Sequence, residues 1–242
     1  MHLDHIVHFI EETPEQAAAH WSEKGFYAAV GGRHEQWGTH NALLYLKNCY
    51  VEWLAVEKMD IARNANHPLT ALLLHDRQGF GAVCLRTDRI EALNERLIKE
   101  GFETTGILNA QRKTGSGDVI RWKMLFLTEE ISDQLPAPFF IEWEETDEMR
   151  YESLRKRQAI QPSNEKLELD SLIFGVHDPE ESRSKWVRIL GGSLQLPNCR
   201  IDFEKIAGQK ERLQKVVFKQ GQTEEAYEAG VYVLPVQGNR EN

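Results

Sequence analysis

The sequence predicts an α+β protein made of two βαβββ units and a partial third one. Runs rich in β-branched and aromatic residues alternate between apolar and polar positions, and they flank segments with helix start and stop signals. The order strand, helix, three strands occurs over residues 1–57, recurs over 79–146, and begins again over 166–242. A Glu-Trp pair also recurs in the last predicted strand of both complete units.

The first unit begins with an alternating strand at residues 3–10. Thr13 and Pro14 mark a helix start, as N-cap and first helical residue, and Gly25 marks its end. Residues 31–40 form a polar loop or hairpin punctuated by glycine. The remaining strands of this unit are expected at 26–30, 41–46 and 49–56.

The second unit follows a connector, residues 57–78, with a short helix expected around Pro68–Asp76. Asp88 caps the helix of this unit and Gly101 ends it. Its strands are expected at 79–87, 102–108, 119–128 and 138–145, with a polar hairpin tip at 111–118.

The charged stretch 146–165 is expected to be a linker or a surface helix whose charges are solvated. A third start follows, with a strand at 167–176, a helix opened by Asp178-Pro179 and an end at Gly191. Further strands are expected at 193–196, 200–206, 212–219 and 231–236. This unit is less regular than the other two.

Composition excludes several classes of function. The net charge of −9 disfavours binding to nucleic acid or to an anionic membrane, and no apolar run is long enough to span a bilayer. The N-terminus lacks a secretory signal, and three widely spaced cysteines fit a reducing compartment, so we expect a cytoplasmic protein. No phosphate-binding loop or nucleophile elbow is present.

Glu52 and Glu142 are unusual because each lies within an apolar strand. Alternation places Glu52 on one face with Tyr50 and Leu54. A carboxylate on a half-buried face needs a cation, a metal ion or hydrogen-bond donors, so the two copies indicate a shared cavity. The alternative is that both pair with Arg or Lys, or that His5 bonds to one of them.

The strand order resembles the vicinal-oxygen-chelate superfamily, which includes glyoxalase I, extradiol dioxygenases and bleomycin-resistance proteins. The closer match is its glyoxalase-like domain branch of bacterial proteins. The residues that carry the resemblance are 3–8 (LDHIVH), 31–43 (GGRHEQWGTHNAL) and 50–52 (YVE). The resemblance implies that the two complete units curl into a cup-shaped mixed sheet.

In that superfamily the first and last strands of each unit supply metal ligands. The resemblance therefore implies a metal site of His5, Glu52 and Glu142. Counting back from the helix cap places the fourth ligand position at Gly81, and at Ser171 in the third unit, so one ligand is missing. The gap at Gly81 indicates either room for substrate or lost catalysis.

One imidazole and two carboxylates suit a divalent cation such as Zn, Mn, Fe or Ni, or no metal at all if they only line the cavity. The leading hypothesis is a metal-dependent lyase or isomerase that stabilises an enediolate, with Glu52 and Glu142 as catalytic groups. The alternative is a metal-free protein that binds or sequesters a small molecule. An extradiol-type dioxygenase is the third choice, because a second histidine is lacking.

The loop at 31–40 and the strand after it offer a second polar cluster. His34, Trp37, His40 and Asn41 are predicted to bind a small-molecule substrate, with His40 as a candidate for the missing imidazole. The alternative is a surface loop whose residues only form a turn and bind no ligand. Trp53 is expected to pack under a helix, as is Trp143. The sequence is compatible with a homodimer as well as with a monomer.

Overall fold

The structure, a computed structural model, describes residues 1–113 and 119–236. Part of the predicted hairpin tip and the last six residues of the third unit lie outside the described residues. As predicted, the fold is α+β with curled mixed sheets. No helix in the described part of the chain is long and apolar enough to cross a membrane.

The first two units form one eight-stranded sheet with the order β2-β3-β4-β1-β5-β8-β7-β6. Its middle strands, β1 and β5, are antiparallel; β4 runs parallel to β1, and β8 runs parallel to β5. The two halves are therefore related by an approximate twofold axis between β1 and β5. The strands are β1 (His2–Phe9), β2 (Ala29–His34), β3 (Thr39–Tyr45), β4 (Tyr50–Val56), β5 (Gly79–Arg86), β6 (Leu108–Lys113), β7 (Val119–Leu125) and β8 (Phe139–Trp143).

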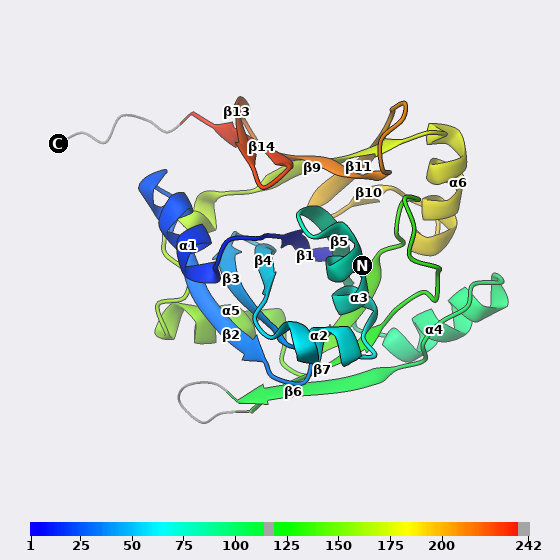
Figure 1. The fold of residues 1–242 in the computed structure, drawn as a ribbon, viewed down its shortest axis with the longest axis horizontal. Coiled ribbons are helices and arrows are strands. Elements are labelled where there is room, and N and C mark those ends of the chain that lie inside the picture. The colour runs from blue at the N-terminus through cyan, green and yellow to red at the C-terminus, as the bar shows by residue number, and fades with distance from the viewer. Residues whose placement is uncertain (114–118, 237–242) are drawn as a thin grey trace.

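Helices cover both faces of this curled sheet. On the convex face lie α1 (Pro14–Glu23), which begins with a capping box at Thr13, and α4 (Ile90–Lys99). Trp21 of α1 stacks on Trp53 with ring centroids 5.2 Å apart, which confirms the expected packing of Trp53 under a helix. On the concave side, α2 (Met59–Asn64) and α3 (Pro68–Asp76) lie in front of the curl in Figure 1, and α5 (Asp147–Lys156) lies behind it.

The third unit forms a separate six-stranded sheet along the top of Figure 1, with the order β10-β11-β9-β12-β14-β13. It repeats part of the pattern, because β11 runs parallel to β9 and β14 runs parallel to β12, while β9 and β12 are antiparallel. Its elements are η1 (Asn164–Lys166), β9 (Leu169–Val176), α6 (Pro179–Leu190), β10 (Gln195–Leu196), β11 (Cys199–Lys205), β12 (Arg212–Phe218), β13 (Gly221–Tyr227) and β14 (Gly230–Pro235).

Two element predictions were displaced. The strand predicted at 102–108 begins at Leu108, because Gly101 and Gly106 adopt positive φ angles that interrupt an extended backbone. The strand predicted at 26–30 runs from Ala29 to His34, so part of the predicted loop is strand, and the turn is confined to residues 35–38.

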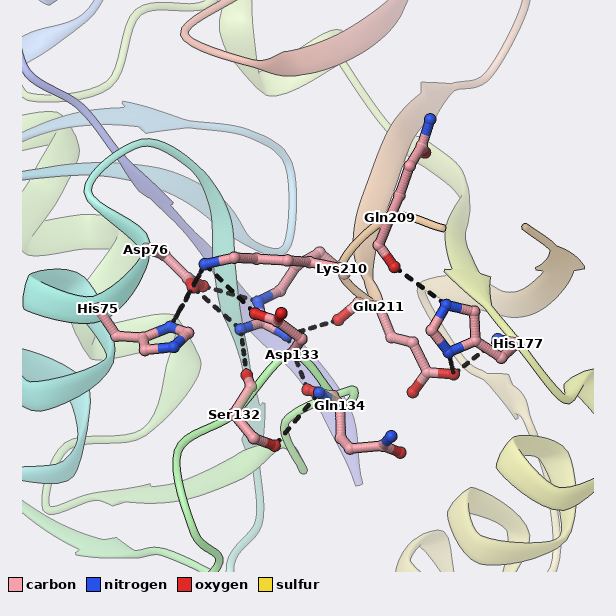
Figure 2. Close-up of polar contacts among 10 residues, drawn as sticks. His75, Asp76, Ser132, Asp133, Gln134, His177, Gln209, Lys210 and Glu211 are labelled. Atoms are coloured by element: carbon pink, nitrogen blue, oxygen red, sulfur yellow. Dashed lines mark hydrogen bonds and ion pairs between the residues drawn. The ribbon is translucent and has the colours of Figure 1, made fainter. Parts of the chain in front are cut away.

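Polar contacts join the third unit to the first two units. Tyr232 of β14 places its hydroxyl 2.6 Å from Nδ1 of His8 and accepts a hydrogen bond from Nε1 of Trp53 at 3.1 Å. Arg212 donates to both carboxylate oxygens of Asp76, at 2.6 and 2.9 Å. Figure 2 shows the surroundings of the labelled Asp76. Arg212 also donates to the backbone oxygens of Ser132, Gln134 and Glu211.

Candidate functional site

The concave side of the eight-stranded sheet encloses a cavity of about 110 Å³. One water molecule needs roughly 10–15 Å³ on this scale, so the cavity has room for a small organic molecule. The wall from the first unit is polar, and the wall from the second unit is largely apolar. The polar wall includes His5, Asn41, Tyr50 and Glu52, and the apolar wall includes Phe139 and Ile141.

A β-bulge in β1 turns two consecutive polar residues toward the concave side. Leu3 pairs with Leu85 and His5 pairs with Cys84, which leaves Asp4 without a cross-strand partner. Asp4 is buried, and its Oδ2 accepts hydrogen bonds from Arg86 at 3.1 Å, Arg150 at 3.4 Å and the Trp143 indole at 3.0 Å. Burial alone would raise the pKa of Asp4, but Arg150, His5 and Arg86 outweigh it and hold that pKa well below its usual range.

His5 and Glu52 face each other at the centre of the polar wall. Nδ1 of His5 lies 2.8 Å from Oδ1 of Asp4, and Nε2 of His5 lies 3.6 Å from Oε2 of Glu52. Asn41 of β3 donates to the other oxygen of Glu52 at 2.6 Å. Tyr50 stacks on the His5 ring at 4.5 Å, which fixes the plane of the imidazole.

This arrangement is suited to moving a proton. Asp4 accepts the proton on Nδ1 of His5, so the lone pair on Nε2 points toward Glu52. Nε2 of His5 and Oε2 of Glu52 face each other at 3.6 Å, without a hydrogen bond between them. Both side chains are buried, so a ligand that enters the cavity would meet an imidazole and a carboxylate side by side.

Glu142 lies on the other face of the sheet, away from His5 and Glu52. Its Oε2 accepts a hydrogen bond from the backbone nitrogen of Ile90 at 2.8 Å, at the start of α4, and its Oε1 accepts one from Lys123 at 3.2 Å. These contacts match the alternative in which the carboxylate only pairs with a cation and a helix N-terminus. The three predicted metal ligands do not converge in this structure.

The strand register explains this placement. His5 pairs with Tyr50 in the first unit, and Cys84 pairs with Phe139 in the second. Because β1 and β5 are related by the approximate twofold axis, Cys84 corresponds to His5, and Ile141 corresponds to Glu52. The two Glu-Trp pairs are thus offset by one residue, which reverses the faces of their side chains.

The strand register also changes the expectation for Trp143 and the expectation for Gly81. Trp143 lines the cavity instead of packing under a helix, and its ring lies 4.0 Å from the guanidinium of Arg150. Gly81 is not open space for substrate, because the ring of Phe9 lies over it, and a Cβ there would approach the ring to 2.0 Å. Gly81 is also three residues from Cys84, the true counterpart of His5.

Three of the four predicted substrate-binding residues line the cavity, namely His34, Trp37 and Asn41. His40 does not, because it lies between Thr39 and Asn41 on β3, and alternation turns it to the other face. The cavity nevertheless gains a further imidazole, from a residue that the sequence did not indicate. His67, in the connector before α3, stacks on Trp37 with centroids 4.1 Å apart and is only 6% exposed.

Sequence reasoning missed both His67 and the cavity face of α5. The His-Pro pair at a helix start was the available signal for His67, whose pKa is lowered to about 4 by burial and by nearby His34. On α5 and just beyond it, Arg150, Leu154 and Arg157 line the cavity at helical spacing. The expectation that the charges of this stretch are merely solvated is wrong for Arg150, which is 8% exposed.

A metal ion fits this donor set poorly. Asp4, His5 and Cys84 offer ligand atoms within 4.8 Å of one another. However, two guanidinium groups already neutralise Asp4, and burial raises the pKa of the Cys84 thiol well above its usual value. The remaining pair, His5 and Glu52, is fewer than the three protein ligands typical of a catalytic zinc site.

Comparisons with known proteins agree with this fold. A family model described as "Glyoxalase-like domain" matches residues 3–190. A hypothetical protein from Staphylococcus aureus is 23% identical, with 95% of this chain and 97% of that chain covered and a TM-score of 0.80.

Weaker structural similarity extends to methylmalonyl-CoA epimerases. The Streptomyces coelicolor enzyme is 14% identical, with 59% of this chain and 96% of that chain covered and a TM-score of 0.41. The Mycobacterium tuberculosis enzyme is 14% identical, with 62% and 91% covered and a TM-score of 0.40. No curated protein matches the sequence significantly.

Proposed function

The chain belongs to the glyoxalase-like domain family, and we propose that it binds a small vicinal-oxygen compound and exchanges a proton with it through Glu52 and His5. The observation that carries this proposal is the buried Glu52 carboxylate. Asn41 holds one of its oxygens at 2.6 Å, and the other faces Nε2 of His5 at 3.6 Å. One oxygen is therefore positioned, and the other is free to act as a base.

In the proposed reaction, Oε2 of Glu52 removes a proton from a carbon next to a carbonyl group. The electron pair of the broken C–H bond moves onto the carbonyl oxygen and forms an enolate. Return of a proton to the same carbon gives exchange. In a hydroxyketone, return to the former carbonyl carbon, with transfer of the hydroxyl proton to the enolate oxygen, gives the isomer. His5, oriented by Asp4, shares the proton with Glu52 between these steps. The proposal assigns no step to a metal ion, since the donor set fits one poorly.

Solvent deuterium exchange tests the proposal. The protein is incubated in D2O with a panel of small 2-oxo acids and hydroxyketones, and NMR follows loss of the proton signal beside each carbonyl. We expect catalysed exchange with the native protein and none with Glu52→Gln. Binding of a panel member without exchange would reject the proton transfer and support a sequestering role. The apolar Ile141, at the position that matches Glu52, favours that second function.

A further inference from the structure

Arg150 of α5 directs an unoccupied edge of its guanidinium group toward the cavity. Its Nη1 donates to Asp4 at 3.4 Å and lies 3.6 Å from Asp147. Among the described residues, neither its Nε nor its Nη2 has a hydrogen-bond partner, and neither is among the fully enclosed atoms without one. Since Arg150 is 8% exposed and lines the cavity, this edge opens onto the cavity.

The edge formed by Nε and Nη2 carries two parallel N–H groups. Two parallel N–H groups match the two oxygens of a carboxylate, and such a bidentate contact is among the strongest hydrogen-bonded pairs in proteins. Trp143 lies under the plane of the guanidinium at 4.0 Å and limits its rotation. The contact with Asp4 fixes the opposite side of the group. Arg150 is therefore held with its free edge presented to a ligand.

The surroundings favour one monovalent anion over a phosphate group. Leu154 lies one turn beyond Arg150 on the same helix face, and Glu145 also lines the cavity. A dianion would be repelled by that carboxylate and would need more donors than one edge supplies. Arg157 lies a further turn along the chain, at the exposed rim, and forms no ion pair within the described part of the chain. It can attract an anion toward the mouth.

We propose that Arg150, assisted by Arg157, binds a carboxylate group of the ligand, so that the substrate class is a small 2-oxo or 2-hydroxy carboxylic acid. This inference rests on the proposed function for the reacting end of the ligand. Arg150 contacts Asp4, Asp4 contacts His5, and His5 faces Glu52, so the anchor and the base are close neighbours. A carboxylate held by Arg150 therefore places the adjacent carbons beside Glu52.

A matched pair of probes tests the anchor by isothermal titration calorimetry. 2-Oxobutanoate and 1-hydroxybutan-2-one share a ketone and an adjacent oxygen, and only the first is a carboxylate. We expect the native protein to bind 2-oxobutanoate at least about tenfold more tightly, because a charge-assisted bidentate contact is lost with the hydroxyketone. Dihydroxyacetone phosphate is a third probe that carries a phosphate group, and we expect it to bind more weakly than 2-oxobutanoate.

Three variants locate the effect. Arg150→Lys keeps the charge beside Asp4 but lacks the bidentate edge, and we expect it to lose most of the preference for the carboxylate. Arg86→Lys is the matched control, because Arg86 pairs with the same Asp4 and Asp147 but does not line the cavity, so the preference is retained. Arg157→Gln changes an exposed residue that folding does not need, and we expect a smaller loss, roughly twofold to fivefold.

Equal binding of both probes by the native protein overturns the inference, as does tighter binding of the phosphate. An unchanged preference in Arg150→Lys does so too. If that variant fails to fold, equal binding of the two probes by the native protein still decides against the anchor, and an unchanged preference in Arg157→Gln rejects the assisting role of Arg157. Binding is measured separately from exchange. A carboxylate preference without deuterium exchange therefore leaves this inference standing and rejects the proposed function.

Discussion

The two halves of the eight-stranded sheet share one backbone plan and carry opposite chemistry. At corresponding positions the first half has His5 and Glu52, and the second half has Cys84 and Ile141. The first half supplies an oriented proton-transfer pair, and the second supplies an apolar wall completed by Phe139 and other aromatic rings. The duplication therefore has not produced two half-sites of equal weight. One half holds the reactive groups, and the other shapes the space in front of them.

The largest expected difference between the halves is catalytic. Glu52→Gln removes the base and should reduce proton exchange by about 10²- to 10⁴-fold, the usual contribution of a positioned general base. Glu142→Gln is the matched control from the other Glu-Trp pair. It should leave exchange unchanged and cost only about 1 kcal/mol of stability, through weaker contacts at the start of α4. Deuterium exchange and urea unfolding of both variants measure these effects. An equal loss of exchange in Glu142→Gln would restore the symmetric site that the sequence predicts.

The sequence is sufficient for the fold, because alternation and repeat order depend on local patterns. The placement of His5 beside Glu52 follows from the resemblance to a known superfamily and not from the local pattern. The sequence is not sufficient for the second half. The face on which Glu142 lies depends on how β8 pairs with β5 and β7, and a one-residue offset cannot be counted from helix caps. Arg150 was missed for a related reason. A charged helix such as α5 is solvated when it is isolated. Only its packing against the rest of the protein brings one face of α5, which includes Arg150, to the cavity.

The two halves meet at Asp4, which joins β1 to Arg86 of β5, Trp143 of β8 and Arg150 of α5. Asp4→Asn should cost about 3–5 kcal/mol of unfolding free energy, because it leaves two buried guanidinium groups with one fewer partner. Asp76→Asn is the comparison variant, since it breaks the buried pair with Arg212 at a distance from the cavity. We expect both variants to lose stability in urea titrations.

Of these two variants, only Asp4→Asn should also impair deuterium exchange, because Asp4 orients His5 and Asp76 pairs with Arg212 instead. Exchange that survives in Asp4→Asn, at a temperature where the variant is folded, would show that the junction is purely structural. Impaired exchange in Asp76→Asn would show instead that the contact between the sheets controls the cavity.

Placing an imidazole and a carboxylate in the second half tests whether side-chain identity alone accounts for the different chemistry of the two halves. Cys84→His combined with Ile141→Glu places an imidazole and a carboxylate at the positions that correspond to His5 and Glu52. We expect stoichiometric Zn²⁺ or Mn²⁺ binding and a stabilisation of about 3–4 kcal/mol at metal concentrations of roughly 100 to 1,000 times Kd. Metal analysis and thermal unfolding check this, with Cys84→His alone as the control. Stoichiometric metal in the native protein would contradict the distinction drawn between the halves.

Two buried histidines outside the reactive pair should make the stability of the protein depend on pH. Burial lowers the pKa of His8, and that of His67, to about 4. A folded-state pKa below the unfolded value near 6.5 means that the unfolded chain binds more protons. The resulting stability is fully present above about pH 6.5 and is lost as the pH falls toward about 4, by about 1.4 kcal/mol per pH unit for each histidine.

Asp4 and Asp76 have lowered pKa values, so their contribution is lost only below about pH 4. Above that pH the slope comes mainly from histidines, and His2, whose pKa burial also lowers, contributes to it in every variant. His67→Phe should flatten the slope with little loss of stability at pH 7, because Nε2 of His67 has no hydrogen-bond partner among the described residues and Nδ1 has only a long contact, 3.5 Å, with the Thr70 hydroxyl. His8→Gln should flatten it at the cost of the contacts with Tyr232 and Glu228. Urea titrations across this range measure both slopes. A slope unchanged in His67→Phe would mean that this imidazole is charged in the folded protein, and the connector end of the cavity would then be cationic.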